Sequence, residues 1–198
     1  MKYKILLILI LISHFTFGQI RYDSIEKCLI TKRFPETVLE NGEFKNYVQF
    51  DLGDYYCYNG KYENNLKFKI LRKDTNTIVF ADDDSQSDAM IFKPKFFSNS
   101  DQSICVIMIE IATEYSWGQQ IVVIKNNKIL PLGYLDYAVA IDNGNSIADY
   151  CDFVCVNDKL ILQFQEVPII NWEDEEHIIQ GKDLKFELTD YDIQRIDK

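Results

Sequence analysis

The feature that most constrains the fold is an apolar run from Ile104 to Ala112, which only Glu110 interrupts. A run of this kind is typical of a β-strand that is buried on both faces. Such a strand lies inside a sheet, and helices or a second sheet must cover both of its faces. The sequence therefore predicts a layered structure built around residues 104–112.

The rest of the chain favours further strands. It contains 13 Phe and 12 Tyr against only 8 Gly and 4 Pro, and turn dipeptides recur at short intervals. Asn41-Gly42 and Asn59-Gly60 are typical hairpin turns, and we expect further hairpins at Asn126-Asn127 and Asn157-Asp158. The predicted fold class is all-β or β-dominated α+β, with a single domain of about ten mostly antiparallel strands.

One short helix is predicted near the N-terminus, from Ser24 to Thr31. Asp23 or Ser24 could cap it, and Ile25, Cys28 and Leu29 have the spacing of one helical face. We therefore expect the β-rich domain to begin with a single helix.

The first eighteen residues have the layout of a secretory signal peptide. Lys2 and Lys4 precede an unbroken run of Ile and Leu, and small residues, Thr16 and Gly18, stand before a possible cut at Gln19. The apolar run is shorter than the about 20 residues that span a bilayer. The segment resembles the signals of exported proteins from Gram-negative bacteria. We therefore predict a signal peptide at residues 1–18 and a single exported domain at 19–198, periplasmic or secreted, with no transmembrane segment in the mature chain.

The chain is strongly acidic. It has 31 Asp+Glu against 21 Lys+Arg, a net charge of -10, and the predicted signal peptide would remove two of the lysines. Nucleic acids are bound by Lys and Arg that neutralise phosphates, so a nucleic-acid partner is not expected. The charge favours solubility and, if there is a partner, a basic one.

Five cysteines lie in the predicted mature chain: Cys28, Cys57, Cys105, Cys151 and Cys155. In an oxidising compartment they could form at most two intramolecular disulfides. If Cys151 and Cys155 share a strand, their Cα atoms lie about 13 Å apart. A disulfide needs less than about 7 Å, so these two should not pair. Any one of the five could equally be a small buried apolar residue.

Motifs for the common catalytic chemistries are absent from the sequence. The mature chain would keep one histidine, His177, and it has no H-E-x-x-H, G-x-S-x-G or C-x-x-C motif. We expect no cofactor and no metal. Two possibilities stay open: a Cys–His dyad with His177, and a carboxylate pair such as Glu110 with Glu114, as in glycoside hydrolases.

The candidate binding residues are Glu114, Tyr115 and Trp117, which interrupt two apolar strands. Large aromatic side chains at a turn can anchor a partner, because they offer contact area at low entropic cost. The alternative is that Tyr115 and Trp117 fold back over the core.

These observations predict an exported, non-enzymatic β-rich protein that binds a protein or another macromolecule. An inhibitor or immunity-type role against a basic enzyme or toxin is one concrete form. The alternatives are a secreted hydrolase that acts on glycans or peptides through a carboxylate pair, and a structural component of the cell envelope.

Overall fold

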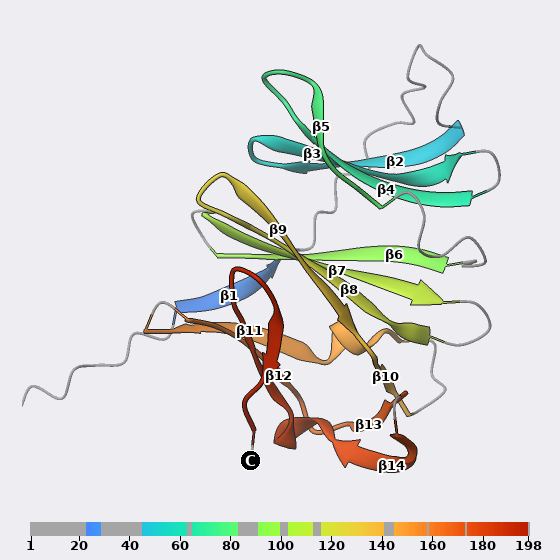
Figure 1. Ribbon diagram of the computed structural model, residues 1–198, viewed down its shortest axis with the longest axis vertical. Helices are drawn as coiled ribbons and strands as arrows, with labels where there is room; N and C mark the ends of the chain where they lie inside the picture. The colour runs from blue at the N-terminus through green and yellow to red at the C-terminus, as the bar shows by residue number, and fades with distance from the viewer. Residues whose placement is uncertain are drawn as a thin grey trace, which may run out of the picture.

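The computed structural model describes residues 23–28, 45–62, 65–82, 91–99, 103–112, 116–140, 145–157, 159–172 and 174–197. Over these residues the chain is dominated by antiparallel strands, as the sequence predicts (Figure 1). The strands are β1 (Asp23–Cys28), β2 (Lys45–Leu52), β3 (Tyr55–Tyr62), β4 (Asn65–Arg72), β5 (Thr77–Asp82), β6 (Ile91–Ser98), β7 (Ile104–Ala112), β8 (Ser116–Lys125), β9 (Lys128–Leu135), β10 (Tyr137–Val139), β11 (Cys151–Val156), β12 (Lys159–Phe164), β13 (Pro168–Asn171), β14 (Asp174–Gln180), β15 (Lys185–Leu188) and β16 (Ile193–Arg195). Two short 3₁₀ helices, η1 (Ile147–Asp149) and η2 (Gly181–Asp183), lie between them.

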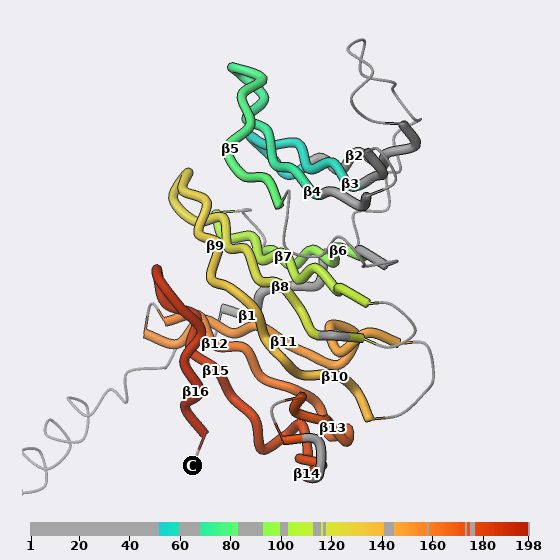
Figure 2. Tube along the Cα trace, turned by 45° about the vertical axis from the view of Figure 1, so that its right-hand side comes forward, coloured from blue at the N-terminus to red at the C-terminus, as the bar shows by residue number. Residues whose placement is uncertain are grey.

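Nine strands form one large sheet in the order β16-β15-β12-β11-β1-β6-β7-β8-β9. β1 joins its two halves, because Asp23 to Ile25 pair with β11 and Glu26 to Cys28 pair with β6. The sheet curls so far that its two edge strands, β9 and β16, come into contact (Figure 2). The curl places the two halves of the sheet on either side of one core.

This first core lies inside the curl. Phe97 on β6 and Phe153 on β11 meet there edge to face, with ring centroids 4.8 Å apart. Met108 and Ile121 reach it from β7 and β8, and neither is exposed at all. The three-stranded sheet β10-β13-β14 lies at the lower end of Figure 1 and adds Tyr137 and Ile169 to the same core.

A second core lies on the other face of β6, β7 and β8. The four-stranded sheet β2-β3-β4-β5 covers this face (Figure 1) and contributes the fully buried residues Cys57, Phe68 and Ile70. The Tyr55 hydroxyl donates a hydrogen bond of 3.1 Å to the backbone carbonyl of Asn127, which ties β3 to the β8–β9 turn.

The central strand predicted at residues 104–112 is confirmed as β7, with the same bounds. Its side chains alternate between the two cores: Val106 and Met108 enter the first, and Ile107 and Ile109 enter the second. The run is continuously apolar because each face of β7 meets a different core.

Two of the predicted hairpins are confirmed. β8 and β9 turn at Asn126 and Asn127, which have φ angles of 52° and 57°, and β11 turns into β12 after Asn157, which has a φ of 50°. Asn tolerates this left-handed region better than other non-glycine residues. These turns therefore form where the sequence places the residue type that they require.

The prediction of a turn at Asn59-Gly60 is wrong. Both residues lie inside β3, where they pair with Phe68 and Lys67 of β4. The β3–β4 ladder extends to the pair Tyr62 and Asn65, so the connection lies further along the chain. A longer ladder satisfies more backbone hydrogen-bonding groups, which outweighs the local turn preference of the dipeptide. The predicted turn at Asn41-Gly42 lies outside the described residues.

The predicted N-terminal helix, Ser24 to Thr31, is not tested over its whole length. Residues up to Cys28 are described as strand β1, paired on both sides, while residues 29–31 lie outside the described part of the chain. The predicted signal peptide, residues 1–18, also lies outside it. Within the described ranges no helix is long and apolar enough to cross a membrane.

Candidate functional site

The predicted binding residues fall at the end of the β7–β8 hairpin. Glu114 and Tyr115 lie outside the described residues, and Trp117 is described only as backbone within β8. The structure therefore defines the strands that carry this turn and the side chains beside it, at Glu110, Ser116 and Gln119.

The pairing of β7 with β8 becomes irregular next to the turn. Ile111 pairs with Gly118 and Ala112 pairs with Ser116, so Trp117 is an extra residue with no partner across the ladder. This is the arrangement of a β-bulge, a feature that is frequent beside functional sites because it redirects a side chain. The bulge thus places Trp117 outside the regular pairing of β7 with β8.

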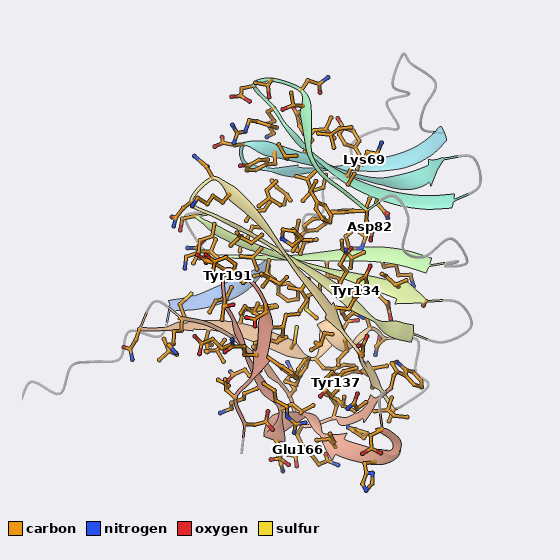
Figure 3. All side chains as sticks on the ribbon, viewed as in Figure 1. Lys69, Asp82, Tyr134, Tyr137, Glu166 and Tyr191 are labelled. Carbon is orange, nitrogen blue, oxygen red and sulfur yellow. The ribbon has the colours of Figure 1, made fainter. Side chains whose placement is uncertain are left out.

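Gly118 maintains this bulge. Its φ is +138°, and a Cβ at this position would lie 2.7 Å from the carbonyl oxygen of Leu135. Only glycine combines that backbone angle with so close an approach to a neighbouring strand. The start of β8 is therefore held against the junction of β9 and β10, which Tyr134 and Tyr137 flank in Figure 3.

Three polar side chains lie together on the face of β7 and β8 that is directed toward the first core. Gln119 pairs with Glu110, Ser116 pairs with Ala112, and both pairs continue the rows formed by Met108 and Ile121. We call Glu110, Ser116 and Gln119 the polar cluster. Glu110 is only 8% exposed and Gln119 is not exposed at all.

The polar cluster is short of hydrogen bonds. Both amide atoms of Gln119 and the hydroxyl oxygen of Ser116 are buried without a hydrogen-bond partner among the described residues. A buried polar group without a partner costs about 1–3 kcal/mol. Such groups are rare in folded proteins, and ordered water or an ion can supply the hydrogen bonds that the protein does not.

Lysines and a short helix border the polar cluster. Lys93 on β6 pairs with Glu110, and its neighbour on the same face, Lys95, forms an ion pair with Asp149 of η1. η1 begins with a capping box between Ser146 and Asp149. These contacts place η1 over the sheet beside the polar cluster.

The carboxylate pair expected of a glycoside hydrolase is not found directly across from Glu110. Its cross-strand neighbours are Lys93 and Gln119, and neither is an acid. The proposed pair with Glu114 is untested, because Glu114 lies outside the described residues. Nor do the described ranges contain a group of three or more His, Cys, Asp or Glu that could hold a metal ion.

One possible Cys–His dyad, Cys57 with His177, has unsuitable surroundings. His177 is on β14 with 73% of its side chain exposed, and it bonds to Asp174 on the same strand. Cys57 is fully buried, and this burial raises the pKa of its thiol well above the usual value. A nucleophilic cysteine needs the opposite shift, which favours the thiolate.

Comparison with known proteins identifies no relative of this chain. No family model, no curated protein and no solved structure matches this chain.

Sequence reasoning missed the polar cluster, although two signals were present. Glu110 is the one break in the apolar run, and Gln119 and Gln120 are polar residues beside the apolar residues from Ile121 to Ile124. Each taken alone fits a solvent-exposed position. Only the register of β7 against β8 shows that Glu110 and Gln119 lie opposite each other and are buried.

Proposed function

We propose that this chain is an exported, non-enzymatic binding protein. It contacts a macromolecular partner with the end of the β7–β8 hairpin, through Glu114, Tyr115 and Trp117. The acidic charge of the chain favours a basic protein as the partner, so inhibition or neutralisation of such a protein is the concrete form of the role. The periplasm or the exterior of the cell is the compartment that residues 1–18 favour.

The polar cluster is the observation that carries this proposal. If Trp117 and Tyr115 folded back onto this face of the sheet, they would lie on Glu110 and Gln119 rather than on apolar side chains. An aromatic ring packed there would cover polar side chains in place of apolar ones, which stabilises the fold less. The polar cluster therefore supports a role for these aromatic residues in binding over a role in the core.

Replacement of Trp117 by alanine tests this proposal. An aromatic anchor in a partner's pocket contributes roughly 2 kcal/mol or more to binding, so Trp117→Ala should remove most of the partner captured by the wild-type protein. The unfolding free energy should change by no more than about 0.5 kcal/mol, as is usual for surface positions. The measurements are quantitative capture from an envelope extract, read by mass spectrometry, and a chemical denaturation curve.

Tyr191→Ala is the matched control, because Tyr191 is an aromatic residue that is 89% exposed and lies in the β15–β16 connection. It should leave capture unchanged. If Trp117→Ala instead costs roughly 3–5 kcal/mol of stability, Trp117 belongs to the core and the binding site is refuted.

A further inference from the structure

Cys57 and Cys105 lie on the facing sides of the two sheets that enclose the second core. Cys57 is on β3 of the four-stranded sheet, and Cys105 is on β7 of the large sheet. Cys57 is completely buried, Cys105 is 6% exposed, and both belong to the same buried cluster. The two thiols are thus directed into one apolar layer from opposite sides.

Their positions along the two strands also correspond. The bond from Tyr55 to Asn127 joins the start of β3 to the β8–β9 turn. Cys57 lies two residues beyond Tyr55 on the same face of β3. Cys105 pairs with Ile124, which stands three residues before Asn127. Both cysteines therefore lie near the end of the two sheets that the hydrogen bond from Tyr55 to Asn127 joins.

An electrostatic effect supports their proximity. The charge of the Cys105 thiolate adds to burial in raising the pKa of Cys57. A neighbouring charge acts on a pKa over a short distance, so this direction agrees with the shared burial of the two residues in the second core.

Cys151 and Cys155 are poor partners for either thiol. Cys151 lies in the first core, where its sulfur is 3.5 Å from the Met108 sulfur. Met108 and Cys105 are on opposite faces of β7, so the sheet separates Cys151 from Cys105. Cys155 is four residues from Cys151 on β11 and packs against the same first core.

We propose that Cys57 and Cys105 form a disulfide that links the two sheets in the oxidised protein. Each thiol loses its proton and one S–S bond forms. The two electrons reduce a disulfide oxidant, such as glutathione disulfide, to two thiols. The bond forms during folding, before the second core closes over both sulfurs. The proposal does not depend on what the β7–β8 turn binds.

Peptide mapping after oxidative refolding tests the proposal. The full chain is denatured, reduced, refolded with a mixture of reduced and oxidised glutathione, alkylated in denaturant and digested with trypsin without reductant. Cleavage after Lys and Arg puts Cys57 in residues 46–61, Cys105 in residues 96–125, and Cys151 together with Cys155 in residues 129–159. We expect residues 46–61 and 96–125 to be recovered as one linked species that separates on reduction.

Two variants sharpen the result. Cys155→Ser should keep the linked species, whereas Cys105→Ser should remove it and leave residues 46–61 alkylated. Recovery of both peptides from the wild-type protein in alkylated form would overturn the proposal. So would a link from either of them to the peptide that carries Cys28. The wild-type result decides the matter even if Cys105→Ser does not fold.

Discussion

At the scale of single residues, His177 has a predictable titration. Its Nδ1 lies 2.9 Å from a carboxylate oxygen of Asp174, and this hydrogen bond, helped by the negative charge, raises the pKa of His177 above 6.5. Stability from this contact is fully present below the pKa of the unfolded chain, and it is lost as the pH rises through the higher pKa of the folded protein. An NMR titration of the imidazole should give a midpoint above 6.5.

Asp174→Ala provides the comparison for His177. Removing the carboxylate should return the midpoint to the ordinary value, with little effect on the fold because both side chains are exposed. Equal midpoints in the wild type and the variant would show that Asp174 does not hold the imidazolium in solution.

The residues of the candidate site were predictable only in part. The aromatic pair Tyr115 and Trp117 is visible in the sequence as an interruption between two apolar strands. The burial of Gln119 is not visible, because it follows from β7 on one side and β9 on the other, both of which lie outside its own segment. The role of Gly118 is hidden for the same reason, since the carbonyl that excludes a side chain there belongs to Leu135.

At the scale of elements, the bulge in β8 can be tested with two glycines. Gly118 and Gly133 both have positive φ angles, but only at Gly118 would a Cβ meet a backbone atom, at 2.7 Å; at Gly133 nothing lies within 4 Å. Gly133→Ala should cost roughly 1–3 kcal/mol from backbone strain alone. Gly118→Ala should cost clearly more, because β8 must also move away from Leu135.

Chemical denaturation of the two glycine variants gives both values. A larger loss at Gly118 reports the steric contact, since only there would the added Cβ meet a backbone atom. Equal losses would mean that β8 does not lie against the β9–β10 junction as closely as described.

Hairpins were predictable where the turn residues also had to adopt positive φ, as at Asn126 and Asn127. They were not predictable where the sequence offered a turn that the ladder did not use, as at Asn59-Gly60. The central strand was predictable because the alternation of β7 between two cores leaves no polar face, apart from Glu110. The curl of the large sheet was not predictable from the sequence. It depends on which strands pair with one another, and no single strand reveals this.

At the scale of the whole molecule, β7 and β8 are shared by the two cores, so the cores should unfold together. Phe153 in the first core and Phe68 in the second are matched sites for substitution, because both are essentially unexposed phenylalanines. Phe153→Ala and Phe68→Ala should each cost roughly 3–5 kcal/mol. Each should shift one common unfolding transition.

Urea unfolding, monitored by fluorescence and by circular dichroism, checks that the two cores unfold in one transition. Coincident fluorescence and circular-dichroism curves indicate a single cooperative transition. Two separate transitions, with each variant shifting only one of them, would mean that the four-stranded sheet unfolds independently of the curled sheet.

The position of β1 has a consequence for the order of folding. Asp23 pairs with Cys155, so the first described strand is completed by one that lies far along the chain. During synthesis β1 emerges early, yet its second neighbour, β11, follows only after β2 to β10. Pairings so distant in sequence must meet the entropy of loop closure before they contribute stability, and folds rich in them form in milliseconds to seconds rather than microseconds. Until β11 arrives, one edge of β1 has no partner. Closure of the curled sheet is therefore a late step, which begins only when β11 can pair with β1.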